Sequence, residues 1–373
     1  GHAVRAVYLY TGMADLAAEI CDAELLTACR RLWGNIVQKK MYITGGIGST
    51  FMGEAFTVDY DLPSDTAYCE TCASVGLMFF AERMLENEIN SEFADVMELA
   101  FYNTVLAGMQ LDGKRFFYVN PLEADPGISG KACTHSHVLP QRPQWYACAC
   151  CPPNVARLIG SIGKYAYGEN GDTVYCHLFA AGKVDFSNGM FLECTTDYPY
   201  GMSVKYTVSG NGKLAVRVPK WSRKYTLRVN GAEVPAAPEN GYLYVDVSGN
   251  AEVELLLDGT PTFVRASGKV PRLSGMNALM RGPLVYCFEG ADNGSVRELR
   301  LDRSAVPAVS EIEPELLGGT VTLTAKAFRS EDCEELYSSE PEKLTPCEAV
   351  AIPYYTWGNR RENEMRVWVN VKY

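Results

Sequence analysis

The sequence lacks the features that would place the protein in a membrane or on nucleic acid. None of its apolar runs approaches the roughly 18 residues that a membrane-spanning helix needs. It also lacks a basic patch: 45 acidic residues outnumber 34 basic ones, and the formal net charge is −11 at pH 7. Nucleic-acid-binding domains are typically basic. We therefore expect no membrane and no nucleic-acid partner, and a carbohydrate or another small substrate fits the composition better.

Short-period repeats and low-complexity segments are also absent, and the residues given do not open with the pattern of a secretory leader, which an upstream segment could still carry. The first residues, Gly1-His2-Ala3, open directly into a helical pattern, so we expect the chain to begin inside a larger fold. The 13 cysteines are an odd number and are not spread as a disulfide framework. Six of them fall within residues 69–151, which is more typical of metal binding or catalysis in a reducing compartment, and we predict a cytoplasmic protein.

The spacing of apolar residues changes near residue 168. Before it, the pattern predicts helices over residues 3–10, 23–37, 70–87, 93–106 and 154–167, and one short strand over residues 116–119. After it, short apolar or alternating runs separated by Asn-Gly turns are typical of β-sandwiches. Helices followed by strands predict separate domains, which we place at residues 1–167, 168–269 and 270–373.

Two motifs resemble binding sites only superficially. The glycine-rich run over residues 43–49 is not followed by Gly-Lys-Ser/Thr, so we reject a phosphate-binding loop. His135 and His137 form a His-x-His pair that could bind a metal. In a loop rich in Gly, Pro and Ser, however, we interpret both as solvent-facing.

The cysteine-rich segments over residues 68–72 and 148–153 carry the chemistry that the sequence predicts. Thiolates and carboxylates are zinc ligands. Either Cys69 with Cys72, or Glu70 with Cys72, could share one metal with Cys150 and Cys151. Adjacent residues can reach one ion from an irregular turn, which the following prolines favour. The alternative is a group of buried thiols without a metal.

A zinc-bound thiol is deprotonated at neutral pH, and a thiolate is a strong nucleophile. Glu54 lies just before the first cysteine segment between Gly53 and apolar residues, so we expect it to be buried. Burial raises the pKa of a carboxyl and suits it to general-acid catalysis. Near the second segment, Cys148 is expected to line the site, and Trp145 and Tyr146 either stack on a sugar ring or pack in the core.

Six segments together resemble glycoside hydrolase family 127, the β-L-arabinofuranosidases, within a wider group that includes family 146. They run in one order along nearly the whole chain, over residues 1–6, 44–49, 53–56, 68–74, 148–157 and 352–360. The resemblance implies a retaining hydrolase acting on a glycoside or oligosaccharide that ends in β-L-arabinofuranose. It also implies an (α/α)6 barrel, of which residues 1–167 form the C-terminal part, followed by two β-sandwich domains.

The resemblance further implies roles for individual residues. Cys150 matches the nucleophile and Glu54 the general acid/base. The ligands of a Zn²⁺ ion would be Glu70, Cys72, Cys150 and Cys151. The substrate-binding residues would be His2, Tyr118 and Glu70.

In this family about half of the barrel and two further sugar-binding histidines would lie upstream. We therefore expect these 373 residues alone to be inactive, to expose a large apolar patch and to aggregate. Two alternatives stay open: a glycosidase of other specificity with a structural zinc and two catalytic carboxylates, and a non-catalytic carbohydrate-binding or scaffold fragment. We also predict a homodimer formed through the β domains.

Overall fold

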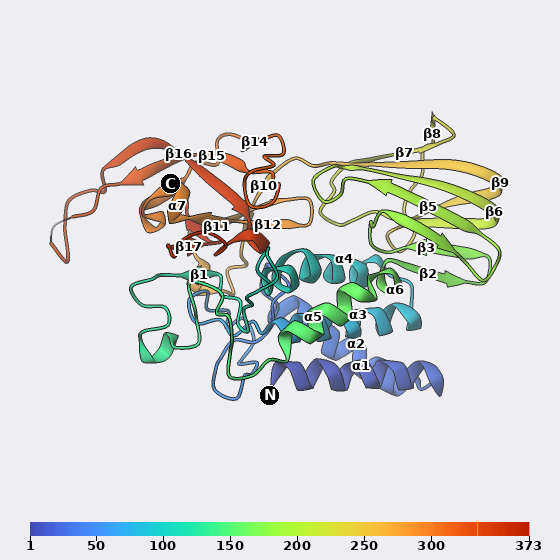
Figure 1. Ribbon diagram of the computed structural model, residues 1–373, viewed down its shortest axis with the longest axis horizontal. Helices are drawn as coiled ribbons and strands as arrows, with labels where there is room; N and C mark the ends of the chain where they lie inside the picture. Colours follow the sequence, from blue (N-terminus) through green and yellow to red (C-terminus); the bar gives the residue numbers. More distant parts are fainter. Residues whose placement is uncertain (334, 373) are drawn as a thin grey trace.

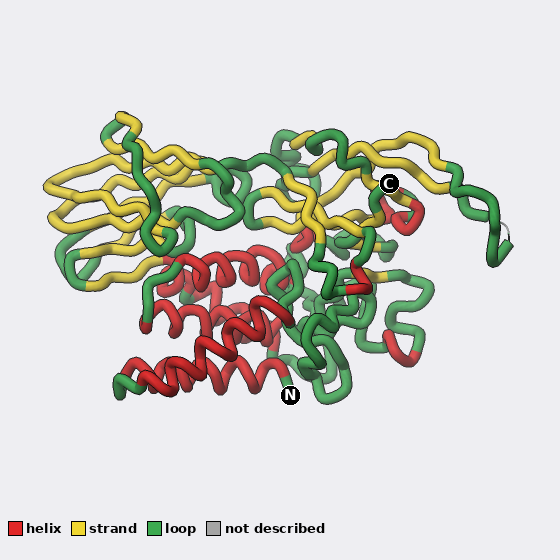
Figure 2. Tube along the Cα trace, turned by 180° about the vertical axis from the view of Figure 1, so that it is seen from behind, coloured by secondary structure: helices red, strands yellow, loops and turns green. Residues whose placement is uncertain are grey.

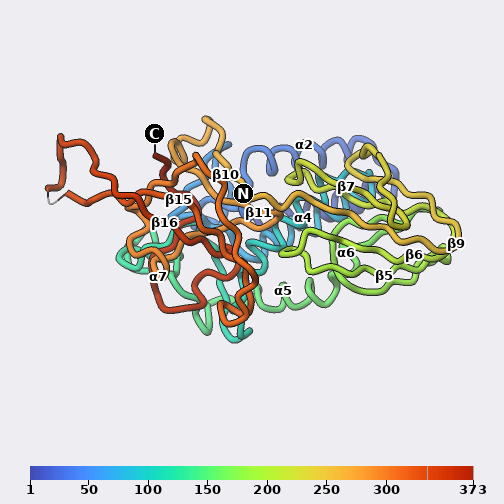
Figure 3. Tube along the Cα trace, turned by 90° about the horizontal axis from the view of Figure 1, so that it is seen from above, coloured from blue at the N-terminus to red at the C-terminus, as the bar shows by residue number. Residues whose placement is uncertain are grey.

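The computed structural model describes residues 1–333 and 335–372. Figure 1 shows a helical layer, built from the first 166 residues, lying beneath two β-sheet regions. Seen from above in Figure 3, the strands β5 to β9 lie at one end of the molecule and β15 and β16 at the other. The helices lie mainly beneath the first sheet, and loops of the N-terminal region lie beneath the second (Figure 2).

The helical layer is centred on α3, most of whose residues are buried. The α-helices here are α1 (Ala3–Glu19), α2 (Ala23–Lys39), α3 (Thr71–Asn87), α4 (Ser91–Ala100), α5 (Cys151–Gly160) and α6 (Ile162–Ala166), with a π-helical turn η1 (Phe101–Val105) and a 3-10 turn η2 (Cys133–His135). Side-chain caps fix three of the starts: His2 accepts a hydrogen bond from a backbone N–H group of α1, Asp22 accepts two from α2, and Asn90 accepts one from α4.

We predicted that the helical residues would expose a large apolar patch, and α3 does not contribute to one. Leu77, Met78 and Phe80 are fully buried, because neighbouring helices pack on several sides of α3. Exposed apolar side chains lie instead on α1, where Leu9 and Leu16 are 62% and 49% exposed.

The first sheet follows directly from α6. Its strands are β2 (Tyr167–Asn170), β3 (Thr173–Cys176), β4 (Gly182–Asp185), β5 (Phe191–Thr196), β6 (Ser203–Arg217), β7 (Tyr225–Val229), β8 (Ala232–Glu233) and β9 (Tyr242–Leu257). The main strand order is β2-β3-β6-β9-β7-β8. The long strands β6 and β9 pair antiparallel from Ser203↔Leu256 to Arg217↔Tyr242, and alternate residues fill one apolar core.

The second sheet incorporates a strand from the N-terminal region. Its strands are β1 (Glu123–Ala124), β10 (Thr262–Arg265), β11 (Met276–Arg281), β12 (Leu284–Glu289), β13 (Leu299–Leu301), β14 (Ala308–Val309), β15 (Leu323–Ser330), β16 (Leu344–Pro353), β17 (Met365–Arg366) and β18 (Val369–Asn370). Short helical pieces connect them: η3 (Pro271–Leu273), α7 (Gly290–Asn293), η4 (Val296–Glu298) and η5 (Tyr354–Thr356). Pairing of β1 with β17 anchors the loops of the N-terminal region to this sheet.

A buried ionic cluster joins the helical layer to the first sheet. Arg217, at the end of β6, is fully buried and pairs with Asp95 and Glu98 of α4. Trp221 and Tyr198 donate further hydrogen bonds to Glu98, at 3.0 and 2.6 Å. Since each charge has a partner, burial of the cluster is compatible with a stable fold.

The predicted order of helices followed by mostly β regions is confirmed, but several boundaries are wrong. Residues 116–119 form no strand; Phe116 and Val119 make only isolated bridges, to Met109 and Glu70. The predicted helix over 93–106 passes into the π-helical turn η1, and that over 154–167 begins at Cys151 and breaks at Ser161. Within the described residues, no helix is both long and apolar enough to cross a bilayer.

Candidate active site

Three helices begin at one place. His2 is the N-cap of α1, Glu70 that of α3 and Cys150 that of α5. In Figure 1 α1 and α5 start near the same end of the helical layer, and Figure 2 shows green loops gathered beside that end. Helix N-termini carry partial positive charge, so thiolates and carboxylates are favoured here.

The four residues expected to bind zinc converge at this point. One carboxylate oxygen of Glu70 and the sulfurs of Cys72, Cys150 and Cys151 all lie within 4.8 Å of one another. The Cys150 sulfur lies 3.4 Å from Glu70 Oε1 and 3.7 Å from the Cys151 sulfur, which lies 3.5 Å from that of Cys72. Since no disulfide links them, all three sulfurs are free to act as ligands.

The structure decides between Cys69 and Glu70 as the partner of Cys72. The side chain of Cys69 is fully buried on the opposite side, against the glycine-rich loop. A Cβ placed on Gly46 would lie 2.7 Å from the Cys69 sulfur, and one on Gly48 would lie 2.4 Å from the Tyr68 carbonyl oxygen. The glycines therefore allow close packing behind the cluster. This packing explains why the loop is rich in glycine although it is not a phosphate-binding loop.

Pro152 and Pro153 do not follow an irregular turn, as we predicted, but lie within a helix. Cys151 is the first residue of α5, and Pro152 and Pro153 follow it within the first helical turn. Proline is tolerated there because the first N–H groups of a helix have no intrahelical acceptor. Adjacent cysteines reach one point because Cys150 caps the helix that Cys151 begins.

Burial and crowding shift the ionisation of the cluster. Burial raises the pKa of the Glu70 carboxyl to about 8, and the neighbouring Cys150 sulfur adds to this shift. Hydrogen bonds from Cys150 and Cys151 lower the pKa of the Cys72 thiol to about 5, whereas hydrogen bonds with Cys150 and Cys72 raise that of Cys151. Several acidic groups thus share one small space, an arrangement that a divalent cation would relieve.

Glu54 lies beside this cluster on a strained turn. Its backbone adopts a left-handed φ of 52°, which is unfavourable for a residue with a Cβ and is common at functional sites. Its Oε2 accepts a hydrogen bond from the Tyr118 hydroxyl at 3.1 Å and lies 3.2 Å from Nε2 of His2. The expectation that Glu54 is buried is wrong: its side chain is 35% exposed. This exposure leaves the carboxylate open to a substrate or water.

His2 and Tyr118 are both placed by backbone contacts. Nδ1 of His2 accepts the Arg5 backbone N–H at 3.4 Å, so Nε2 carries the proton that points to Glu54. The carbonyl of Tyr118 accepts the backbone N–H of Thr71, which holds residues 116–119 across the start of α3. Glu54, His2, Tyr118 and the start of α3 thus form one hydrogen-bonded unit.

An aromatic row flanks Glu54. Tyr118 stacks on Tyr146 with ring centroids 4.8 Å apart, and Tyr68 packs edge-on against Tyr118. His137 continues the row between Tyr68 and Phe51 at 5.3 Å from each. The row bounds one side of the site.

The interpretation of both histidines of the His-x-His pair as solvent-facing is wrong. His137 is only 8% exposed and bonds the Thr66 carbonyl, while His135 is partly buried and lies 3.2 Å from Asp65. They contact different partners and do not join the cysteine cluster. Trp145, in contrast, is 71% exposed, and Cys148 is also exposed.

The donor set fits zinc. Three thiols and one carboxylate give four ligands of the kinds that tetrahedral zinc sites use. Calcium and magnesium prefer oxygen ligands throughout, so a sulfur-rich set disfavours them. A second group of donors, His2, Glu54 and Glu70, adjoins the first and shares Glu70 with it.

Sequence reasoning assigned no role to Asn154 and Tyr8, which lie behind the cluster. The Asn154 amide bonds the Tyr8 hydroxyl at 3.1 Å, and a hydrogen bond from Asn154 helps to lower the pKa of the Cys72 thiol. Asn154 does directly follow the Cys-Cys-Pro-Pro run in the sequence. That position in the sequence could have indicated that Asn154 lies beside the cysteine cluster.

Three family models match nearly the whole chain in order. Residues 1–164 match the GH127 catalytic domain of β-L-arabinofuranosidases, residues 173–258 the middle domain and residues 261–370 the C-terminal domain of the same family. A non-reducing end β-L-arabinofuranosidase from Bifidobacterium longum subsp. longum is 43% identical over 99% of this chain. The chain spans 59% of the length of that relative.

Solved structures of the same family are also similar. A GH127 β-L-arabinofuranosidase from Geobacillus stearothermophilus T6 superposes with a TM-score of 0.96 at 44% identity, over all of this chain and 61% of that one. Another GH127 β-arabinofuranosidase gives a TM-score of 0.90 at 34% identity, over all of this chain and 60% of that one.

Proposed function

The chain belongs to glycoside hydrolase family 127, and on that premise we propose that it is the catalytic part of a retaining β-L-arabinofuranosidase. The substrate would be a glycoside or oligosaccharide with β-L-arabinofuranose at its non-reducing end, as the name of the Bifidobacterium relative states for that enzyme. In this proposal the nucleophile is the Cys150 thiolate and the general acid/base is Glu54.

The observation that carries the proposal is the juxtaposition of these two groups across Glu70. Cys150 lies 3.4 Å from one oxygen of Glu70, and Glu54 has an oxygen within 4.8 Å of a Glu70 oxygen. Cys150 is half-buried whereas Cys72 and Cys151 are buried, so Cys150 is the sulfur most open to a substrate. A sugar placed between Cys150 and Glu54 would contact both a nucleophile and a proton donor.

In the first step the sulfur of Cys150 attacks the anomeric carbon. The bond from that carbon to the leaving-group oxygen breaks, and the proton of the Glu54 carboxyl passes to the departing oxygen. His2 and Tyr118 hold Oε2 of Glu54, so Oε1 is the atom that faces the glycosidic oxygen. A thioglycosidic bond to Cys150 results.

In the second step water attacks the same carbon from the side that the leaving group vacated. Glu54, now a carboxylate, takes a proton from this water, and the carbon–sulfur bond breaks to restore the thiolate. Two inversions give net retention, as in retaining glycosidases that use two carboxylates.

Glu70, Cys72, Cys150 and Cys151 would hold a zinc ion. When bound, the ion would stabilise the thiolate of Cys150 at neutral pH and improve it as a leaving group in the second step. Glu70 would also orient the sugar, since its carboxylate lies between the cysteines and the His2–Glu54 pair.

The arrangement of the donors also supports an alternative mechanism, in which the zinc is only structural and two carboxylates perform the reaction. The four donors form a closed set, which is the pattern of structural zinc sites. Glu54 and Glu70 oxygens also lie within 4.8 Å of one another, close to the roughly 5 Å that separates the carboxyls of retaining glycosidases. In that case Glu70 would be the nucleophile and the cysteines would only hold the metal.

Finer structural assignments belong to the same proposal. We assign the helices of residues 1–167 to part of an (α/α)6 barrel and residues 168–269 and 270–373 to β-sandwich domains. The separate apolar core of the first sheet supports this division. A cytoplasmic location and a homodimer through the β domains stay predictions, and light scattering of the purified protein tests the dimer.

Hydrolysis of a chromogenic β-L-arabinofuranoside by zinc-loaded protein that also carries the upstream part of the barrel tests the proposed function, since we expect residues 1–373 alone to be inactive. We expect activity that Cys150→Ser abolishes, because a serine hydroxyl is a much weaker nucleophile. Glu54→Gln should be severely impaired with poor leaving groups but recover rate when the leaving group needs no proton. Bound zinc without any hydrolysis would instead support a non-catalytic scaffold.

A further inference from the structure

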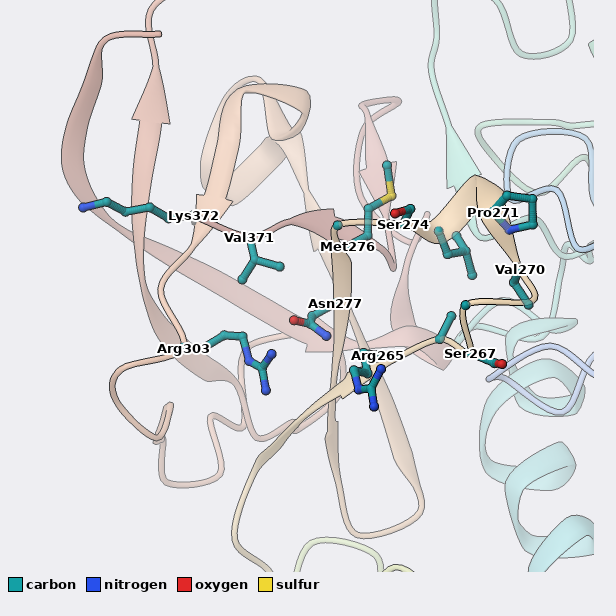
Figure 4. Close-up of a pocket in the computed structure, with 14 residues that line it drawn as sticks. Arg265, Ser267, Val270, Pro271, Ser274, Met276, Asn277, Arg303, Val371 and Lys372 are labelled. Atoms are coloured by element: carbon teal, nitrogen blue, oxygen red, sulfur yellow. The ribbon is translucent and has the colours of Figure 1, made fainter. Parts of the chain in front are cut away.

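A second concave site lies on the C-terminal sheet, built from other elements than the helix N-termini. Figure 4 shows this cleft, which is lined by residues 265–268, 270, 271 and 273–277, from the end of β10 to the start of β11, together with Arg303, Val371 and Lys372. Its volume is about 430 Å³. Pockets that hold small molecules span roughly 300–1,000 Å³, so the cleft has room for one or two sugar units.

The lining is positively charged in a strongly acidic protein. Among the residues that the structure describes, the lining contains Arg265, Arg303 and Lys372 and no carboxylate side chain, although the whole chain has 45 acidic residues. Lys372 is already engaged, since its ammonium lies 3.7 Å from the centre of the Phe328 ring. Among the described residues, Arg265 and Arg303 have no ion pair and no side-chain hydrogen bond, so two exposed guanidinium groups are available.

Between the two arginines lies a buried amide with an unused acceptor. Asn277 is 1% exposed and pairs with Arg265 across β10 and β11. Its Nδ2 donates to the Val264 carbonyl at 3.0 Å, whereas its Oδ1 has no donor in the part of the chain that the structure describes. In Figure 4 Asn277 lies between Arg265 and Arg303. A buried acceptor without a partner is uncommon and indicates a missing donor.

We propose that this cleft is an accessory binding site for an acidic sugar, a uronate unit of a larger glycan. The carboxylate would bind Arg265 and Arg303, since a guanidinium matches carboxylate geometry with two parallel hydrogen bonds. The cleft wall covers Oδ1 of Asn277, so a sugar hydroxyl would donate to it after a small side-chain shift in that wall. Val270 and Leu273 provide apolar surface for the carbon face of the ring.

A uronate fits the cleft better than a simple anion does. Phosphate or acetate would satisfy the arginines but offers no apolar face. A neutral sugar would satisfy Asn277 but leave both guanidinium groups without a counter-charge. The site goes beyond the proposed hydrolase chemistry and does not depend on it, since no residue is shared with the cysteine cluster.

Calorimetric titration of the purified protein with trigalacturonate tests the proposal, with maltotriose and inorganic phosphate as separate probes. We expect trigalacturonate to bind, maltotriose to bind at least tenfold more weakly, and phosphate to compete only weakly. Arg265→Ala combined with Arg303→Ala should weaken trigalacturonate binding at least tenfold. Asn277→Ser should weaken it less and serves as a separate probe of the hydroxyl contact.

Arg223→Ala is the matched control, since it removes an exposed arginine elsewhere, and it should leave binding unchanged. Unfolding curves of all variants would establish that they fold. Hydrolysis of a small arabinofuranoside should be unaffected by the double variant, which separates this site from the catalytic one. Absence of trigalacturonate binding, equal binding by the double variant, or phosphate binding tighter than the uronate would each overturn the assignment.

Discussion

Nε2 of His2 lies 3.2 Å from Oε2 of Glu54, and this contact ties the start of α1 to the strained turn that carries the carboxylate. The Tyr118 hydroxyl bonds the same oxygen at 3.1 Å. Two donors on Oε2 leave Oε1 as the atom that can exchange a proton with a substrate. The orientation of Glu54 therefore depends on residues that are distant from it in the sequence.

Tyr118→Phe removes one of these donors and keeps the ring stacked on Tyr146. A hydrogen bond to a charged group contributes roughly 1.5–3 kcal/mol, so kcat should fall about 10- to 100-fold. The matched control is Tyr146→Phe, because within the described contacts the Tyr146 hydroxyl has no hydrogen-bond partner. Steady-state kinetics on a chromogenic arabinofuranoside measures both. Equal losses in the two variants would argue against the role of the Tyr118 hydroxyl.

Zinc binding should weaken as the pH falls through about 8. Burial raises the pKa of the Glu70 carboxyl to about 8, so below that pH a proton must leave before the oxygen can bind a cation. Competition with a chromogenic chelator between pH 6 and 9 measures the affinity. Cys72→Ser should lose most of the bound zinc, while Cys69→Ser, on the other side of the segment, should retain it. Retention of full zinc content by Cys72→Ser would refute the proposed ligand set.

The protein should lose stability as the pH falls from about 6.5 towards 3. Burial lowers the pKa of His177 to about 3, while an unfolded histidine titrates near 6.5. Between these values the unfolded state binds one more proton, so the free energy of unfolding falls by up to about 1.4 kcal/mol per pH unit. Urea unfolding at several pH values measures this slope. His177→Asn should flatten it below pH 6.5 and leave the slope above pH 7 unchanged, and an unaltered slope in the acid range would contradict the prediction.

Glu98→Gln should destabilise the protein strongly because it leaves the buried Arg217 with fewer negative partners. Breaking a buried ion pair from one side typically costs about 3–5 kcal/mol. Lys183→Ala is the control, because it breaks an exposed ion pair with Glu193, and such pairs contribute about 0–1 kcal/mol. Chemical unfolding of both variants gives the comparison. Similar losses would show that the cluster between α4 and β6 is not important for stability.

Local patterns in the sequence predicted much of the fold. The apolar run of α3 and the alternating strands of the first sheet were recognisable because helices and strands place side chains at characteristic intervals. The π-helical turn at Phe101–Val105 was not, since it continues an apolar helical pattern. Residues 116–119 have the composition of a strand, but they cross the start of α3 and make only isolated bridges.

The site could be predicted only in part. Spacing placed the cysteines in two segments but left Cys69 and Glu70 as alternatives, because only the direction of the chain at the start of α3 decides which side chain faces the cluster. The burial of His137 depends on Phe51 and Tyr68, which lie 86 and 69 residues away in sequence. No local pattern encodes such contacts.

Trapping the glycosyl-enzyme intermediate tests the central claim most directly. The protein would be incubated with an arabinofuranoside that carries an activated leaving group, the reaction stopped rapidly with acid before water releases the sugar, and the labelled peptide identified by mass spectrometry. We expect one arabinosyl-type adduct per chain on Cys150 and none on the Cys150→Ser variant. An adduct on Glu70 or another carboxylate, with Cys150 unmodified, would contradict the thiolate mechanism and favour a structural zinc with catalytic carboxylates.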